Sequence, residues 1–464
     1  MEIRRDHYLE ELLRHKGGDL VKIITGIRRC GKSYLLFKLY KRHLLREGVD
    51  RRHIIEIALD QQKFEKLCNP IALGRYVRDR IVADGKMNYV LIDEIQLAYK
   101  VKKPGAVLSD VAPEDRDLCY VTFYDVLNEL RVMRNVDVYV TGSNSKMLSS
   151  DIATNFRDRG HEIRMYPLSF AEYCRTQAKA GKDKQEMLDD YLAWGGLPLV
   201  VLEPDEREKE RYLKTLCDKL FLKDIKERHH LNDDYVAGKV MDVLSSAVGS
   251  LTNPNKLVKT LGSQMAVKTT NRTLQKYLGY FEDSFLFSRA ERYDVRGRKH
   301  LDYPSKYYAV DLGLRNARVN FREVEDAHLM ENAIYNELVR RGYSVDVGVV
   351  YRVERVDGKT EKRQYEIDFV VNLGRRKVYV QSTYAMDEPG QYERETRPLR
   401  LGGDFFRRIV VMRGYRRPTE DEDGIIHVGI IPFLLDESIL LGERPDRPHR
   451  NGEVISPLAR QFLK

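Results

Sequence analysis

Apolar and polar residues alternate in the first third of the chain as they do in an α/β domain. Apolar and β-branched residues fill 20–26, 89–92 and 136–141, and each run is followed by polar residues. Such runs are typical of strands buried on both faces of a parallel sheet. After the first run, apolar residues recur at helical spacing along SYLLFKLYKRHLL. The pattern predicts strands joined by helices, with polar groups at the strand ends.

The pattern changes in the middle of the chain. From Glu172 to about Asp234 it is helical, and glycines and a proline in YLAWGGLPLVV interrupt it. Residues 235–318 predict three short helices, then two strands joined by the turn VRGRKH. Three helices followed by a basic hairpin are typical of a winged helix-turn-helix. Earlier in the chain, 98–127 reads as a surface loop that leads into a helix starting near Thr122.

The last third predicts a helix and two strands, followed by a charged tail. The helix is expected over His328–Val345 and the strands over QYEIDFVVN and KVYVQSTYA. The segments RRPTEDEDG and LGERPDRPHRNGE are charged and proline-rich, so they are expected to be loop.

Composition limits the class of protein. A chain of 464 residues suggests two to four domains, and its net charge of +9 permits nucleic-acid binding without indicating it. The five cysteines are scattered with no CxxC pair, which argues against disulfides and a zinc site. Neither a membrane-spanning run nor a signal-peptide core is evident, so a cytoplasmic protein is expected.

A glycine-rich loop lies between the first predicted strand and helix. Gly26 and Gly31 allow the backbone to curl so that its N–H groups converge, and the helix N-terminus adds positive charge. Lys32 can reach the terminal phosphates of a nucleotide, and the Ser33 hydroxyl can bind Mg²⁺. The predicted nucleotide-binding residues are Gly26, Ile27, Arg28, Arg29, Cys30, Gly31, Lys32, Ser33 and Tyr34.

Polar residues at the ends of two further strands complete the expected site. Asp93 is suited to hold Mg²⁺, and Glu94 to activate water for attack on the γ-phosphate. Asn144 is the candidate for contacting the γ-phosphate or the attacking water, with helix capping as the alternative for this stretch. Arg157 and Arg159 are placed where an arginine can complete the ATP site of a neighbouring subunit, with a solvated surface loop as the alternative.

Together, GIRRCGKS, LIDEIQ, VTGSNSKMLSSDI and YPLSF resemble a family of prokaryotic AAA+-type ATPases that carry a C-terminal domain of unknown function. The resemblance implies ATP with Mg²⁺ as ligands, a helical lid after the ATPase core, and Asn144 as the sensor residue. The family pattern Arg-Gly-Arg corresponds here to Arg157, Asp158 and Arg159. Arg159 is taken as the arginine finger, which implies self-association, with Arg157 left open.

DNA is the second expected partner. Thr269, Thr270 and Asn271 would face outward on the recognition helix of the winged domain. The predicted DNA-contacting residues, suited to phosphates and base edges, are Arg272 and Lys276 on that helix and Arg296, Arg298 and Lys299 on the wing. The alternative is a winged helix that contacts only protein.

The C-terminal third has the outline of a PD-(D/E)XK nuclease, a fold to which the family resemblance also points. Glu331 lies on the predicted helix and Asp368 on a strand, as metal-binding carboxylates do in that fold. The expected Glu-x-Lys is replaced by Gln381, Ser382 and Thr383, which removes the lysine. A degenerate nuclease fold used for interaction is therefore favoured, and structural hydrogen bonds are the alternative role of the two acids.

The expected organisation is an AAA+-like core over 1–170, a lid over 171–234, a winged helix over 235–318 and a nuclease-like α/β domain over 319–464. The leading hypothesis is an ATPase whose hydrolysis rearranges the later domains, on DNA. The alternatives are a nucleotide-gated DNA- or protein-binding switch with negligible turnover, and a metal-dependent nuclease.

Overall fold

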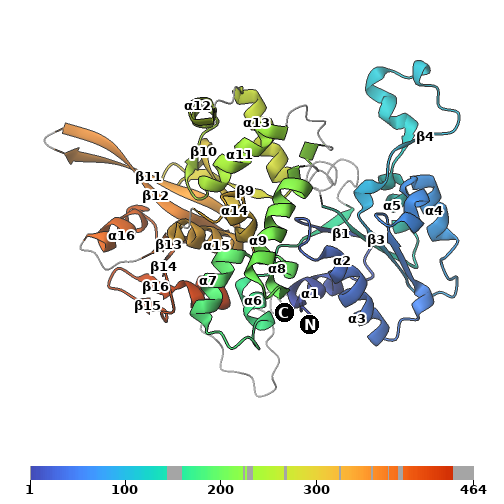
Figure 1. Ribbon diagram of the computed structural model, residues 1–464, viewed down its shortest axis with the longest axis horizontal. Helices are drawn as coiled ribbons and strands as arrows, with labels where there is room; N and C mark the ends of the chain where they lie inside the picture. The colour runs from blue at the N-terminus through green and yellow to red at the C-terminus, as the bar shows by residue number, and fades with distance from the viewer. Residues whose placement is uncertain are drawn as a thin grey trace. The chain divides into compact units, whose positions relative to one another are not determined.

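The computed structural model describes residues 2–143, 159–222, 225–226, 234–265, 269–322, 325–356, 359–374, 376–384 and 390–442 (Figure 1). The residues form two compact units. The first comprises Met1–Glu291 and Asp302–Asn336, and the second comprises Arg292–Leu301 and Glu337–Lys464. The chain therefore passes between the units within strands β9 and β10 and within helix α15.

A five-stranded sheet forms the centre of the first unit, and its described strand pairs are all parallel, in the order β2-β3-β6-β1-β7. The strands are β1 (Val21–Thr25), β2 (Ile54–Ala58), β3 (Asn88–Asp93), β6 (Val136–Thr141) and β7 (Gly160–Arg164). Every residue of β1, β3 and β6 is buried, as continuous apolar runs require. The predicted parallel sheet is confirmed.

Helices cover both faces of this sheet. The phosphate-loop helix is continuous through α2 (Lys32–Tyr34), the π-helical η1 (Leu35–Tyr40) and α3 (Lys41–Arg46). Figure 1 shows these helices with α1 (Asp6–Arg14) on one face, and α4 (Pro70–Arg78) with α5 (Phe123–Arg131) on the other. The short helical turns of this part are η2 (Arg51–His53), η3 (Gln62–Cys68) and η4 (Ile95–Leu97).

The loop that follows β3 contains more structure than expected. It includes β4 (Val101–Lys102), η5 (Leu108–Asp110), η6 (Pro113–Cys119) and β5 (Tyr120–Val121), and β4 pairs with β5. At its end Thr122 caps α5, where it forms a capping box with Asp125. The predicted helix start near Thr122 is confirmed.

A helical segment follows the sheet in the chain. It comprises α6 (Phe170–Thr176), α7 (Lys184–Trp194), α8 (Pro198–Leu202), α9 (Glu206–Thr215) and η9 (Leu216–Phe221). The predicted turn between α7 and α8 is present, with Gly195 at a φ of 75°. The Asp311 carboxylate, which caps α14 (Leu312–Arg318), accepts a hydrogen bond from the Gly196 N–H at 2.8 Å. A Cβ on Gly195 would lie 2.5 Å from that carboxylate, so the turn requires glycine.

The three predicted short helices follow: α11 (Asp234–Ser246), α12 (Pro254–Met265) and α13 (Asn271–Asp283). Strand β8 (Leu251–Thr252) precedes α12 and pairs antiparallel with β10 (Lys299–Ala309), which follows β9 (Phe287–Asp294) in the chain. One detail of the prediction is wrong. Thr270 precedes α13 as its N-cap, because its hydroxyl accepts a hydrogen bond from the Thr273 N–H at 3.2 Å, and Thr269 also lies outside the helix.

The second unit is built on a mixed sheet in the order β15-β16-β14-β13-β12-β11-β9, to which β9 contributes residues 292–294. The strands are β11 (Ser344–Val356), β12 (Lys359–Leu373), β13 (Arg376–Thr383), β14 (Arg407–Met412), β15 (Thr419–Glu420) and β16 (Ile425–Gly429). Its core contains Val350, Ile367, Val370 and Val410. The remaining helices are α15 (Asp326–Arg340), α16 (Gln391–Leu401), α17 (Ile430–Leu435) and α18 (Ser438–Leu441).

Two predictions for this region need correction. The helix expected to reach Val345 ends at Arg340, and Ser344 already begins β11, because SVDVGVV alternates at the period of a strand. The first tail segment is not entirely loop, since Thr419 and Glu420 pair with β16.

Candidate nucleotide-binding site

The glycine-rich loop connects β1 to α2 and is shaped by close contacts of its backbone. Gly26 has a φ of 132°, and a Cβ on it would lie 2.0 Å from the Met165 carbonyl oxygen. Gly31 has a φ of 104°, and Arg29 between them also has a positive φ, 68°. Glycine is required at position 26 for both space and conformation.

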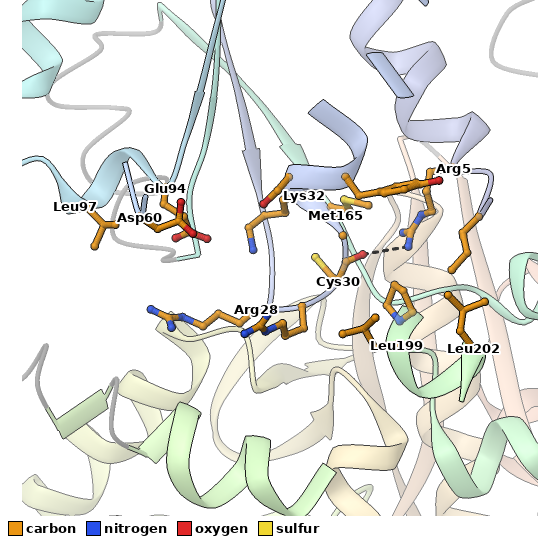
Figure 2. A pocket seen from close by; sticks show the side chains of 16 residues that line it. Arg5, Arg28, Cys30, Lys32, Asp60, Glu94, Leu97, Met165, Leu199 and Leu202 are labelled. Carbon is orange, nitrogen blue, oxygen red and sulfur yellow. Dashed lines mark hydrogen bonds between the residues drawn. The ribbon is translucent and has the colours of Figure 1, made fainter. Parts of the chain in front are cut away.

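Lys32 is buried at the start of the helix. Its ammonium donates hydrogen bonds to the carbonyl oxygens of Gly26 at 2.9 Å and Ile27 at 3.1 Å. The positive charge therefore lies within the loop, facing the cavity beside it (Figure 2). Such a charge is positioned to meet the phosphates of a nucleotide.

The acidic pair lies at the C-terminal end of β3. Asp93 is buried and accepts a hydrogen bond from the Thr141 hydroxyl of β6. Burial raises the pKa of Asp93, hydrogen bonds from Thr141 and Ser33 oppose the rise, and the charges of Glu94 and Asp60 add to it. Ser33 and Asp93 thus lie close together, as the two predicted Mg²⁺ ligands require.

Glu94 is half-buried and held by neighbours that sequence reasoning missed. Its backbone has a φ of 54°, and its N–H donates to Thr141 Oγ1 at 3.0 Å. The Gln96 amide donates to its carboxylate, and the Ser143 hydroxyl lies 3.5 Å from the same oxygen. Gln96 and Ser143 therefore orient the carboxylate expected to activate water. Gln96 is the third residue after β3 and Ser143 the second after β6, and this position near a strand end was the available signal for both.

A cavity of about 650 Å³ joins these groups. It is lined by Arg28, Arg29, Cys30, Gly31, Lys32, Ser33, Tyr34, Asp60, Glu94, Ile3, Arg5, Leu97, Met165, Pro198, Leu199 and Leu202. Figure 2 shows Leu199 and Leu202 of α8 on the same side as Arg5, and Asp60 and Glu94 together on the opposite side. The part of the wall formed by α8 is thus apolar, the opposite side carries the two carboxylates beside Leu97, and the phosphate loop lies between them.

Arg5 connects the N-terminal segment to the phosphate loop. It is 2% exposed, and its guanidinium donates to the Cys30 carbonyl at 3.3 Å and to the Tyr166 carbonyl at 2.6 Å. Its Nε lies 3.2 Å from the Glu172 carboxylate, which compensates the buried charge. Nothing in the sequence pattern singled Arg5 out, because its partners lie far along the chain.

The remaining predicted ATP-site residues fall in different places. Ile27 and Cys30 are buried, Arg28 is half-buried and Arg29 is exposed. Arg159 is exposed, and its carbonyl accepts a hydrogen bond from the Val21 N–H at 3.0 Å at the start of the β1–β7 pairing. Asn144, Arg157 and Asp158 lie outside the described residues.

The predicted DNA-contacting residues are exposed but belong to different units. Arg272 and Lys276 lie on α13 in the first unit. Arg296, Arg298 and Lys299 lie at the β9–β10 turn in the second, where the Arg296 guanidinium donates to the Leu401 carbonyl at 3.1 Å. Asn271 is half-buried, and its amide donates to the Asn255 side chain at 2.6 Å, so it holds α12 and α13 together.

The residues of the nuclease outline make structural hydrogen bonds. Glu331 is buried and accepts hydrogen bonds from Lys306 at 2.8 Å and from the Tyr308 hydroxyl at 2.7 Å. Asp368 accepts one from the Ser382 N–H at 2.9 Å. Within the described part of the chain, no group of three or more His, Cys, Asp or Glu side chains is arranged to hold a metal ion.

Gln381 joins Asp368 to a carboxylate that the sequence had not suggested. Its side-chain oxygen accepts from the Asp368 N–H at 3.3 Å, and its amide donates to Glu395 of α16 at 3.2 Å. Burial raises the pKa of Glu395, and the charge of Asp368 adds to the rise.

Two broader expectations can also be compared with the structure. All five cysteines are free thiols, and four of them are buried. Across the described helices, none combines the length and apolar character needed to cross a bilayer.

A parallel sheet with a phosphate loop after β1 and an acidic pair at the end of β3 defines a P-loop ATPase domain, and residues 19–174 match the family of AAA domains. Residues 185–325 match a domain of unknown function. An uncharacterized protein of Haemophilus influenzae is 32% identical over 435 residues, which cover 93% of this chain and 98% of that protein. The chain therefore belongs to the same family as the Haemophilus influenzae protein.

Other proteins are similar to this chain at lower identity. An uncharacterized protein of Methanocaldococcus jannaschii is 25% identical over 89% of this chain and 87% of its own length. A Walker-type ATPase of Pyrococcus abyssi has 14% identity and a TM-score of 0.44, covering 68% of this chain and 96% of its own. The Aeropyrum pernix ORC2 protein in its ADP form has 11% identity and a TM-score of 0.32, covering 72% and 95%. Both TM-scores are too low to show a shared arrangement of domains.

Proposed function

We propose that this protein binds ATP with Mg²⁺ at the Gly26–Tyr34 loop and hydrolyses it. The observation that carries this proposal is the one cavity that Lys32, Ser33 and Glu94 line together, with Asp93 hydrogen-bonded to Ser33. A lysine charge and convergent N–H groups suit a polyphosphate, and the apolar side of the cavity suits a purine base.

The oxygen donors beside the loop fit Mg²⁺. The Ser33 hydroxyl and the Asp93 carboxylate already share a hydrogen bond, and hard oxygen ligands are those this ion takes. When bound, Mg²⁺ would neutralise charge on the β- and γ-phosphates. Asp93 must be ionised to hold it, and burial opposes that ionisation until a cation is nearby.

The protein's own residues perform the remaining steps. Lys32 exchanges its bonds to the loop carbonyls for bonds to the phosphates. Glu94, oriented by Gln96 and Ser143, accepts a proton from the attacking water. Asn144 acts as the sensor for the γ-phosphate, and Arg159 of one subunit completes the site of another.

Hydrolysis is coupled to the helical segment through α8. Its residues Pro198, Leu199 and Leu202 line the cavity, and the preceding Gly196 is hydrogen-bonded to Asp311. Asp311 caps α14, which packs against α7, α9 and α11. Closure of α8 on the nucleotide therefore pulls on α14, and through it on α11.

The later domains use this movement for binding, with DNA as the partner. Support for a winged helix comes from the order α11-β8-α12-α13-β9-β10, with β8 paired to β10. The nuclease-like domain serves interaction. Cleavage is disfavoured because Glu331 is already bound by Lys306 and Tyr308, and Thr383 stands where the fold's lysine belongs.

The test is turnover by Lys32→Ala. Loss of the loop's charge should lower ATP hydrolysis at least about a hundredfold, comparable to removing one transition-state donor. Lys38→Ala is the matched control, since Lys38 is an exposed lysine on the same helical stretch. Phosphate release and circular dichroism are measured on both. A folded Lys32→Ala protein with normal turnover would contradict the proposal.

Glu94→Gln separates hydrolysis from a nucleotide-gated switch. If Glu94 activates water, the variant binds ATP with unchanged affinity and stops turning it over. If the protein is a switch, hydrolysis is negligible in the wild type and the substitution changes nothing. Fluorescent-nucleotide titration measured beside phosphate release distinguishes the two.

A further inference from the structure

Strands β11 and β12 continue beyond the sheet of the second unit as a two-stranded ribbon. β12 pairs with β13 through Phe369–Leu373, and β11 pairs with β9 through Val347–Val349. Beyond these points the described pairing is between β11 and β12 alone, up to Val356 opposite Lys359. The ribbon consists of residues 351–356 and 359–364, and Figure 1 shows both strands running out past the rest of this unit.

One face of the ribbon carries carboxylates as well as arginines, and ion pairs join them. Residues directly opposite in an antiparallel pair share a face. This face carries Arg352 opposite Arg363 and Glu354 opposite Glu361. Arg363 lies 4.0 Å from Glu354 and 3.8 Å from Glu361, and Arg397 of α16 lies 2.8 Å from Glu354. Arg363 and Arg397 are therefore paired with the two carboxylates of this face.

The opposite face is positively charged. It carries Tyr351 opposite Gln364, Val353 opposite Lys362 and Arg355 opposite Thr360, and these six residues are called the basic face. Among its described side chains the charged ones are Arg355 and Lys362, both exposed cations. Lys362 Nζ lies 4.4 Å from the Tyr351 ring centroid, and Val353 is 65% exposed.

A free ribbon of this kind needs a partner. Two strands without a further layer are only marginally stable in water, so selection for stability alone does not explain the projection. The exposed Val353 and the two cations on the same face indicate a surface that a binding partner covers when the protein functions. An uncompensated positive charge indicates a negatively charged partner.

We infer that the basic face binds double-stranded DNA, with the ribbon lying in the major groove. That groove, about 12 Å wide and about 8.5 Å deep, admits a two-stranded ribbon. Arg355 and Lys362 meet the flanking phosphates. Gln364 and Thr360 carry hydrogen-bonding groups for base edges, and Val353 suits the thymine methyl group. The major groove of double-stranded RNA is too narrow to accept the ribbon.

This inference rests on residues of the second unit and not on ATP hydrolysis. It adds to the proposed function a second DNA contact, which lies outside helix α13 and the β9–β10 turn. ATPase activity measured without DNA must be unchanged by substitutions in the ribbon. Loss of hydrolysis in Lys32→Ala and loss of DNA binding in a ribbon variant are therefore separate results.

The experiment compares two double variants with equal charge loss on opposite faces. Arg355→Gln/Lys362→Gln removes two positive charges from the basic face, and Arg352→Gln/Arg363→Gln removes two from the other. Binding of the full-length proteins to a fluorescein-labelled DNA duplex is measured by anisotropy at several KCl concentrations. The basic-face variant should bind roughly tenfold more weakly, with a salt slope smaller by about 1.8, or about 0.9 per lost phosphate contact.

The control variant should retain wild-type affinity and slope, with both variants folded by circular dichroism. Equal weakening in both variants would assign the effect to net charge and overturn the inference. Wild-type DNA binding by the basic-face variant would also overturn it. Equal competition by double-stranded RNA would overturn it too. A change in the oligomeric state of the basic-face variant without a change in its DNA affinity would assign the face to a second copy of the chain and would also overturn the inference.

Discussion

Replacing Gly26 with alanine should disable the nucleotide site through a single methyl group. Gly26 has a φ of 132°, and its added Cβ would lie 2.0 Å from the Met165 carbonyl oxygen, which belongs to the backbone. Neither group can rotate away as a flexible side chain would. The loop, or the segment that contains Met165, must therefore move.

The size of the effect follows from these contacts. An alanine with positive φ costs about 1–2 kcal/mol in any case. Ordinary contact requires the two atoms to separate by more than an ångström, which also strains the Met165 N–H bond to the Thr25 carbonyl, now 2.7 Å long. Losing that bond adds about 1 kcal/mol. A displacement of about 1 Å in a positioning element can lower turnover about a hundredfold.

Gly48→Ala provides the matched control. Gly48 also has a positive φ, 85°, but in the described part of the chain no atom would lie within 4 Å of its added Cβ. Both variants should lose thermal stability, Gly26→Ala by about 1 kcal/mol more. Only Gly26→Ala should lose ATP turnover, by about a hundredfold. Phosphate release and thermal melting are measured for both.

Hydrolysis of ATP by Gly26→Ala at the wild-type rate would refute the role given to the contact with Met165. An equal loss of turnover in Gly48→Ala would refute it as well, because conformational strain in general, and not the contact with Met165, would then explain the loss.

Two further predictions concern buried charges. Lys22 is 0% exposed and paired with Asp137 inside the first unit. Replacing Lys22 with methionine should lower the free energy of unfolding by about 3–5 kcal/mol, because the buried Asp137 carboxylate loses its cation. A denaturation midpoint equal to that of the wild type would contradict this. Burial raises the pKa of Asp311 from 3.8 to about 6. The folded protein therefore binds the carboxyl proton more tightly than the unfolded chain does. The free energy of unfolding should fall by about 3 kcal/mol as the pH rises from about 4 to about 6. Asp311→Asn should remove that part of the pH dependence in thermal melts, and an identical pH profile would show that the carboxyl does not titrate in this range.

The phosphate loop and acidic pair could be predicted because their chemistry is local. Gly26 and Lys32 are separated by a fixed number of residues, and Asp93 is the last residue of a strand, so neighbouring positions determine where these groups lie. The apolar side of the cavity could not be predicted. Ile3 and Leu199 come from distant parts of the chain, and an apolar side chain has no signature that separates a ligand wall from a core.

Glu331 illustrates the same limit for a charged group. Its place on an amphipathic helix fits a metal ligand as well as a structural acid. Its partners Lys306 and Tyr308 lie on β10, more than twenty residues earlier in the chain, and hydrophobic periodicity does not say which strand a helix faces. Only the pairing of side chains in space separates the two roles. The ribbon was not predicted, because β11 follows α15 after three residues and because the ribbon's second strand, residues 359–364, has no apolar residue.

The position of β1 in the sheet has a consequence during protein synthesis. Its neighbours are β6 and β7, and Arg5, which holds the phosphate loop, contacts a carbonyl 161 residues further along the chain. A nascent chain that ends before β7 therefore has the glycine loop but lacks the strand, the carbonyl and the helix that hold it in place. ATP cannot assist the early stages of folding. The nucleotide can stabilise the domain only after α8 has left the ribosome, long after the glycine loop itself has been made.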